Sequence, residues 1–223
     1  MGFLRDALAS MGRRGLDPHQ IPSYAQFGED RILGGLFGSQ ADGWYVDVGC
    51  NHPIKYSNTW LLYRRGWKGL CVDGNGAFAR LHARHRPRSS FACAVVANSS
   101  EPVEFLIPRA SDLIAGIGES RTGPWARERN DCEVRSIRPE RLDVLLERHG
   151  VPHEFDLLTI DVEGHESEVL ASFDLATWRP HVVACEIHGE DCSVTMRSSP
   201  ALALLDAGYR PVARCGPTSI FVR

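Results

Sequence analysis

The stretch Trp44-Tyr-Val-Asp-Val-Gly-Cys-Asn51 decides the fold of this 223-residue chain. The residues up to Val48 form a short apolar run, interrupted only by Asp47, which is typical of a strand buried inside a sheet. Gly49 ends the run and starts a turn. A buried strand of this kind needs parallel neighbours and helical connections, so we expect strands and helices to alternate along the chain.

The sequence that follows has this alternation. Further strands are predicted at Lys68–Val72, Ser90–Val96, Glu101–Ile107, Phe155–Ile160 and His181–Ile187, with a final strand pair at Tyr209–Arg214 and Ser219–Val222. Helices are predicted at 56–66, 77–86, 138–149, 165–173 and 198–207. We therefore predict an α/β fold: a mostly parallel open sheet with helices on both faces and a C-terminal antiparallel strand pair.

Composition sets limits on the class of protein. The chain has 25 Lys and Arg against 28 Asp and Glu, a net charge of −3, which argues against a general nucleic-acid binder. It contains no apolar stretch of about 18 residues, so we expect no membrane span. The start of the sequence lacks the apolar run of a secretory signal. The seven cysteines are scattered and lack a C-x-x-C pair, so we expect free thiols and a cytoplasmic location.

Three regions are distinguished along the chain. Residues 1–43 are predicted to form an N-terminal arm and helical cover, with a short amphipathic helix near Phe3–Met11. This arm is a candidate lid or homo-oligomer contact, or a frayed end. Residues 44–223 hold the alternating pattern. Within them, residues 108–131 contain glycines and a proline without a core run and are expected to be a loop or short-helix insertion.

Acidic residues follow four of the predicted strands. Asp47 lies at the end of the first, Asp73 at the end of the second, Asp161 at the end of the fourth core strand and Glu186 at the end of the fifth. Because the carboxyl ends of parallel strands share one edge of the sheet, these carboxylates should meet there. So much negative charge needs a partner, such as a cationic ligand, a ribose diol or a metal ion.

The spacing between Gly49 and Asp73 is that of a nucleotide fold, in which an acid at the second strand accepts hydrogen bonds from a ribose. The alternative is an ordinary turn acid in Asp73-Gly-Asn-Gly76. The loop after Gly49 lacks the G-x-G-x-x-G pattern, and Pro53 removes a backbone donor, so the loop is poorly suited to a pyrophosphate. It suits a nucleoside without phosphates, and S-adenosylmethionine is the common candidate.

Four segments of the sequence resemble the FkbM-type family of S-adenosylmethionine-dependent methyltransferases. They are Tyr24–Asp30, Val46–Pro53 with Tyr56–Thr59, Gly66–Gly69 with Val72-Asp73, and Ile160–Glu166. The family has Ser-Gln at Ala25-Gln26, Gly-Ala at Gly49-Cys50 and Glu-Pro at Asp73-Gly74. The resemblance implies a Rossmann-like class I methyltransferase that O-methylates a hydroxyl of a sugar, glycan or natural-product acceptor.

The resemblance also implies a set of cofactor-binding residues. Asp47, Gly49 and Asn51 are expected at the methionine end, with Ser57 and Asn58 beside them, although the last two would also serve as a helix N-cap pair. Gln26 and Asp30 are expected to fold over the cofactor, the alternative being the charged first turn of a helix. Ala94 and its neighbours should lie at the adenine, where a backbone amide could read its edge. Asp161 completes the set.

His165, Asp161 and Glu186 are the candidate catalytic residues. A sugar hydroxyl is weakly acidic, so a general base is useful, and the imidazole of His165 is suitable. The alternative is a structural histidine at a helix start. Asp161, Glu186 and His188 are also candidate ligands for Mg²⁺ or Mn²⁺, which would lower the pKa of the acceptor hydroxyl. The alternative is that Asp161 and Glu163 bind the cofactor or cap the next helix.

The remaining charged segments carry weaker predictions. The basic run Arg80–Arg88 is expected to be a solvated helix face. Residues 108–135, with Arg109, Trp125, Arg127 and Arg129, are expected to contribute to acceptor binding. Two rival functions stay open: an NAD(P)-dependent oxidoreductase on the same sheet, and a protein that binds S-adenosylmethionine without turnover.

Overall fold

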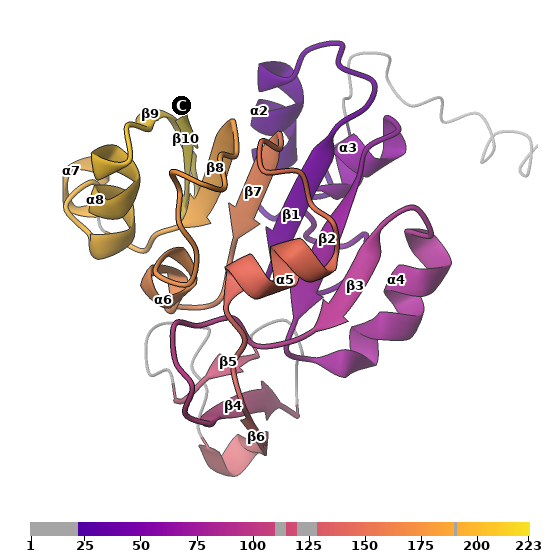
Figure 1. The fold of residues 1–223 in the computed structure, drawn as a ribbon, viewed down its shortest axis with the longest axis vertical. Coiled ribbons are helices and arrows are strands. Elements are labelled where there is room, and N and C mark those ends of the chain that lie inside the picture. The colour runs from indigo at the N-terminus through magenta and orange to yellow at the C-terminus, as the bar shows by residue number, and fades with distance from the viewer. Residues whose placement is uncertain (1–21, 110–114, 120–128, 190) are drawn as a thin grey trace, which may run out of the picture.

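A computed structural model describes residues 22–109, 115–119, 129–189 and 191–223 (Figure 1). Its centre is a seven-stranded sheet in the order β3-β2-β1-β7-β8-β10-β9. The strands are β1 Trp44–Val48, β2 Lys68–Asp73, β3 Ser90–Cys93, β7 Leu157–Ile160, β8 Val182–Glu186, β9 Arg210–Cys215 and β10 Thr218–Val222. All pairings are parallel except those of β10 with β8 and β9. The predicted fold class is confirmed.

The helices connect these strands. They are α2 Glu29–Leu36, α3 Trp60–Arg64, α4 Ala79–His85, α5 Leu142–Arg148, α6 Glu166–Leu170, α7 Cys192–Thr195 and α8 Ser199–Asp206, with a 3₁₀ turn, η1, at Gly76–Phe78. The predicted helices are present, each shorter than its sequence range. The short helix expected near Phe3–Met11 lies outside the described residues.

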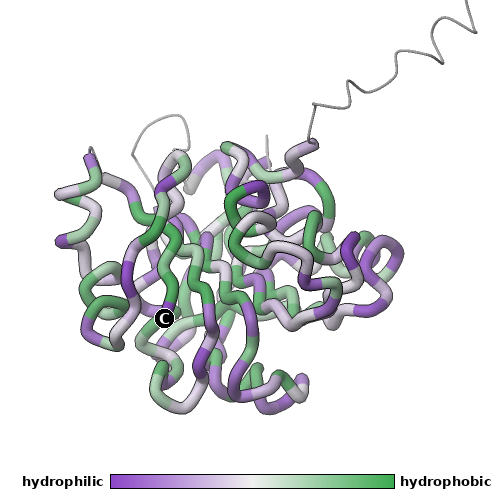
Figure 2. The backbone as a smooth tube through the Cα atoms, turned by 90° about the horizontal axis from the view of Figure 1, so that it is seen from above, coloured by the Kyte–Doolittle hydropathy of each residue, from purple (hydrophilic) through white to green (hydrophobic). Residues whose placement is uncertain are grey.

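Alternate side chains of the strands pack into two hydrophobic cores, one on each face of the sheet. Val46 and Val48 of β1 belong to the core that includes residues of α5, α6 and α8. Tyr45 of the same strand belongs to the second core, which includes Leu33 of α2 and Leu62 of α3. Figure 2 shows the hydrophobic residues gathered along the strands between the two helical layers. This two-sided burial explains the near-continuous apolar runs in the sequence.

A second, three-stranded antiparallel sheet lies beyond the carboxyl ends of the parallel strands (Figure 1). It consists of β4 Val103–Pro108, β5 Gly116–Ile117 and β6 Cys132–Ile137, and a 3₁₀ turn, η4, at Arg129–Asp131 precedes β6. The strand over 101–107 was expected, but its partners were not. The prediction of a loop or short-helix insertion over 108–131 is wrong for β5, whereas the short helical turn η4 agrees with it, and β6 was missed. Residues 110–114 and 120–128 are not described.

Two further sequence predictions need correction. The third strand ends at Cys93 rather than Val96, because Val96 leaves the sheet and pairs in an isolated bridge with Glu140. The basic run is not simply a solvated face, because Arg86 is 1% exposed and His82 is buried. In the part of the chain that the structure describes, no helix is long and apolar enough to cross a membrane. All seven cysteines lie there and are free of disulfides.

Candidate active site

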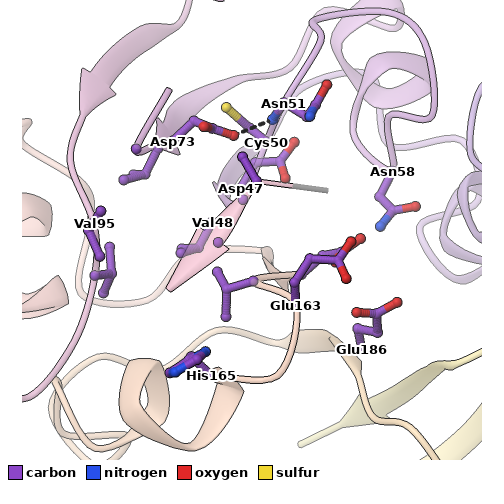
Figure 3. A pocket seen from close by; sticks show the side chains of 18 of the residues that line it. Asp47, Val48, Cys50, Asn51, Asn58, Asp73, Val95, Glu163, His165 and Glu186 are labelled. Carbon is purple, nitrogen blue, oxygen red and sulfur yellow. Dashed lines mark hydrogen bonds between the residues drawn. The ribbon is translucent and has the colours of Figure 1, made fainter. Parts of the chain in front are cut away.

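A cavity of about 420 Å³ opens at the carboxyl ends of β1, β2, β7 and β8, between the central sheet and the small one (Figure 3). Its wall contains most of the predicted site residues: Gln26, Asp47, Gly49, Asn51, Ser57, Asn58, Asp73, Ala94, Asp161, His165, Glu186 and His188. Sequence reasoning had not assigned to the site several other lining residues, among them Phe27, Tyr56, Phe105 and Ile117.

Gly49 allows the first strand and the fourth core strand to end side by side. Its φ is +82°, and a Cβ at this position would lie 1.7 Å from the carbonyl oxygen of Asp161. Backbone bonds run from Gly49 N to Val72 O at 2.9 Å and from Asp161 N to Val48 O at 2.9 Å. These two hydrogen bonds hold the carboxyl ends of β1, β2 and β7 side by side. Only glycine fits, since any side chain would separate the two loops.

Asp47 is held in place by two buried threonines. Thr59 Oγ1 donates to one carboxylate oxygen at 2.5 Å, and Thr159 Oγ1 donates to the other at 2.6 Å. Thr59 precedes α3, and Thr159 lies beside Asp47 in β7. Each oxygen of a carboxylate can accept more than one hydrogen bond, so Asp47 can still face a ligand from the cavity wall.

Asp73 orients the loops on either side of it. One of its oxygens accepts a hydrogen bond from Asn51 N at 2.8 Å (Figure 3), and the other accepts one from Asn75 N at 2.7 Å. Burial raises the pKa of Asp73 from 3.8 to about 6, against the opposing effect of these two amides. Two further acceptor positions on the carboxylate remain for a ligand.

The loop between β1 and α3 is held by a residue that sequence reasoning assigned to solvent. The buried guanidinium of Arg86 donates to the carbonyl oxygen of Pro53 at 2.6 and 2.9 Å, to Ser57 Oγ at 2.6 Å and to Thr59 Oγ1 at 2.7 Å. These contacts fix the segment that carries Tyr56, Ser57 and Asn58 along the cavity. In the fold the Arg86 guanidinium also lies over the aromatic rings of Tyr45, Trp60 and Tyr63, none of which is close to it in sequence.

The structure also bears on the alternative interpretations of Ser57 and Asp30. Ser57 Oγ accepts from the backbone N–H groups of Thr59 at 3.3 Å and Trp60 at 3.1 Å, although the N-cap residue of α3 is Thr59, and Asn58 extends toward the cavity (Figure 3). Asp30 lies in the first turn of α2, and its carboxylate accepts from Ser23 Oγ at 2.7 Å and Tyr24 N at 2.8 Å. It does not line the cavity, so the geometry favours a structural role for Asp30.

An apolar slot forms the wall beside Asp73. Ala94, Val95, Phe105 and Ile117 line it, and the last two come from the small sheet. The backbone N–H of Ala94 donates to the carbonyl oxygen of Asp73 at 3.0 Å. The expectation that an amide here reads the edge of a base therefore does not hold for Ala94, whose amide is already used.

Acidic groups crowd the part of the wall formed by β7 and β8. Burial, together with the nearby Glu186 and Glu163 carboxylates, raises the pKa of Asp161 well above its usual range. His188 Nε2 lies 3.4 Å from Glu186 Oε2, and this contact raises the pKa of His188. One donor atom each from Glu163, Glu186 and His188 lie within 4.8 Å of one another. The structure thus places Glu163, rather than the predicted Asp161, in the potential metal-binding group.

His165 lies on the cavity wall immediately before α6. Figure 3 shows its ring apart from the carboxylates of Glu163 and Glu186. The turn that presents it is fixed by Glu166, whose side chain accepts from the backbone N–H groups of Val162 at 3.3 Å and Gly164 at 3.0 Å. His165, Asp161 and Glu186 thus share one cavity. Their catalytic roles stay predictions.

The sheet order, the terminal antiparallel pair and a cavity at the strand ends with an acid after β2 define a Rossmann-like class I methyltransferase architecture. The chain belongs to the methyltransferase FkbM domain family, whose profile matches residues 47–211. This assignment agrees with the family resemblance seen in the sequence motifs.

Comparisons with solved structures found more distant similarities. A TehB-like SAM-dependent methyltransferase from Corynebacterium glutamicum has a TM-score of 0.45 and 11% identity, over 100% of this chain and 97% of that one. The Burkholderia thailandensis 1,6-didemethyltoxoflavin-N1-methyltransferase, with bound 1,6-didemethyltoxoflavin and S-adenosylhomocysteine, has a TM-score of 0.45 and 14% identity, over 99% of this chain and 86% of that one. An O-methyltransferase from Bacillus cereus in complex with S-adenosylhomocysteine has a TM-score of 0.43 and 14% identity, over 100% of this chain and 91% of that one. No match was found among curated proteins.

Proposed function

We propose that this chain transfers a methyl group from S-adenosylmethionine to a hydroxyl oxygen of a sugar, glycan or natural-product acceptor. The observation that carries the proposal is a single cavity with a ribose-type acid, Asp73, on one side and a histidine with several carboxylates on the other. Such a cavity can hold a nucleoside at one end and a reacting group at the other.

The residues present fit this cofactor. The slot of Val95, Phe105 and Ile117 offers an apolar surface to a purine, and the carboxylate of Asp73 keeps acceptor positions for ribose hydroxyls. Asp47 supplies negative charge for the cationic methionine end. The loop after Gly49 offers little to a pyrophosphate, which counts against the NAD(P)-dependent alternative.

The cofactor, when bound, supplies an electrophilic methyl group on a sulfonium, a good leaving group. The chain's own residues then have two tasks: to hold the acceptor oxygen in line with that methyl group and to remove its proton. His165 is the proposed base, because a histidine side chain can accept and release a proton near neutral pH and His165 lies on the cavity wall. Glu186 provides negative charge beside the acceptor and stabilises the cation that forms when a base takes a proton, and Asp161 borders it on the same cavity wall.

The mouth of the cavity supports an acceptor with a flat or ring-shaped face. Phe27 is 50% exposed and Tyr56 is 56% exposed, and both line the cavity. Tyr56 has a φ of +56°, an uncommon conformation for a non-glycine residue. Exposed aromatic rings of this kind pack against sugar rings and aromatic natural products. The insertion at 108–135 is proposed to add further acceptor contacts.

The test is methyl transfer from radiolabelled S-adenosylmethionine to a panel of hydroxyl acceptors, with amine acceptors as a comparison. We expect labelled product from hydroxyl acceptors with the wild type and a loss of about 10²-fold or more in His165→Ala. The matched control is His181→Ala, because His181 is exposed and lies before β8, at the opposite edge of the sheet. Transfer to amines alone would overturn O-methylation, and unchanged turnover in His165→Ala would remove it from the mechanism.

A further inference from the structure

Three side chains that line the cavity on the side away from Asp73 have the composition of a metal centre. Glu163 follows β7, and Glu186 and His188 lie at the end of β8. One donor atom from each lies within 4.8 Å of the other two. The ligand atoms around one Mg²⁺ or Mn²⁺ ion stand about 3–4 Å apart, so small side-chain rotations would bring these three into coordination.

Glu186 points to a missing partner. The residue is only 8% exposed, and its Oε2 atom is buried without a hydrogen bond to any described residue. Among the described residues it forms an ion-pair contact with His188 Nε2 at 3.4 Å, a long contact to a side chain that is 58% exposed. A buried carboxylate oxygen in this state is costly unless a cation approaches it.

The surrounding charges increase this cost. Glu163 adds a second carboxylate to the same wall, with a donor atom within 4.8 Å of one from Glu186. Glu163 is also held at a φ of +58°, followed by Gly164 at +102°, and this turn directs the chain so that Glu163 faces Glu186 (Figure 3). A divalent cation would neutralise this concentration of negative charge, whereas a single imidazole does so only in part.

We propose that Glu163, Glu186 and His188 form a divalent-cation site that takes Mn²⁺ in preference to Mg²⁺. Two carboxylates suit either ion, and the imidazole ligand favours Mn²⁺. The inference rests on the proposed methyltransferase function for its purpose: an ion there would meet the acceptor rather than the ribose and would lower the pKa of a coordinated hydroxyl. Binding of the ion itself does not depend on that function.

The test is a titration of the metal-stripped full chain with MnCl₂, followed by the loss of the free Mn²⁺ signal in electron paramagnetic resonance. We expect saturation at one ion per chain. Glu186→Gln and His188→Ala should each weaken Mn²⁺ binding by about tenfold or more. Glu154→Gln is the matched control, since Glu154 is an exposed acid paired with Arg179 away from the cavity, and it should leave Mn²⁺ binding unchanged.

Calorimetry with S-adenosylhomocysteine separates this inference from the proposed function. Metal-stripped wild type should bind S-adenosylhomocysteine, and a failure to do so would count against the function and not against the ion site. Absence of Mn²⁺ binding by the wild type overturns the site, as does binding that both variants leave unchanged. If Glu186→Gln does not fold, His188→Ala decides the outcome, because its side chain is mostly exposed.

Discussion

Replacing Asp73 by asparagine should weaken cofactor binding while leaving the fold nearly as stable. The change removes the negative charge but keeps the size and shape of the side chain. One oxygen becomes an NH₂ group that faces the backbone N–H of Asn51 or Asn75, so one of these two hydrogen bonds is lost. The same change removes the charged acceptor proposed to bind the ribose.

The structure gives the sizes of these effects. Loss of one buried hydrogen bond costs about 1–3 kcal/mol in the free energy of unfolding. Against this, the pKa of Asp73 is raised from 3.8 to about 6, mainly by burial. That shift of about two units corresponds to roughly 3 kcal/mol of destabilisation by the charge, which asparagine removes. The two contributions nearly cancel, so we expect a change in unfolding free energy of no more than about 2 kcal/mol.

For cofactor binding, no comparable stabilising effect offsets the loss of the charged acceptor. A hydrogen bond from a hydroxyl to a charged acceptor contributes about 1.5–3 kcal/mol, so the dissociation constant of S-adenosylhomocysteine should rise roughly 10- to 150-fold. Urea denaturation and isothermal titration calorimetry measure the two quantities on the same samples. Asp206→Asn, an exposed position at the end of α8, is the control and should change neither quantity appreciably. Wild-type affinity in Asp73→Asn, within about twofold, would refute the ribose contact.

Three further predictions concern pH, the proposed base and the buried arginine. Affinity for S-adenosylhomocysteine, measured by calorimetry, should fall about tenfold between pH 8 and pH 5, because Asp73 loses its charge below its pKa of about 6. The groups that act on this carboxylate are His82, Asp47 and the backbone amides of Asn51 and Asn75. An affinity that does not change with pH would contradict the prediction. His165→Ala should bind S-adenosylhomocysteine within about threefold of wild type while losing turnover, and a large affinity loss would instead indicate a structural role. Arg86→Met should lower the unfolding free energy by about 3–5 kcal/mol in urea denaturation, since its buried acceptors lose their donor, whereas the exposed Arg84→Met should have little effect.

The central sheet could be predicted from the sequence because its strands are buried on both faces. Residues such as Val46 and Val48 pack on one face and Tyr45 on the other, and two-sided burial leaves a continuous apolar signal. The strand β6, Cys132–Ile137, has no such signal. It lies in a small antiparallel sheet, and most of its residues are partly or fully exposed, so its short polar sequence resembles a loop.

The site could be predicted at its strand ends and not elsewhere. Gly49, Asp73 and Asp161 follow apolar runs directly, so the geometry of a parallel sheet brings them together. Arg86 gave no comparable signal, because in sequence it lies among other basic residues while in the fold its guanidinium is enclosed by the loop before α3. Glu163 was not predicted as a metal ligand, because the direction of its side chain depends on one left-handed backbone turn that the sequence pattern does not indicate.

The most direct test of the central claim is calorimetric titration of the purified full chain with S-adenosylhomocysteine and, separately, with NADH. The cavity after β1 and β2, with Asp73 and a loop poorly suited to a pyrophosphate, predicts saturable binding of S-adenosylhomocysteine and none of NADH. Tight binding of NADH without binding of S-adenosylhomocysteine would contradict the account.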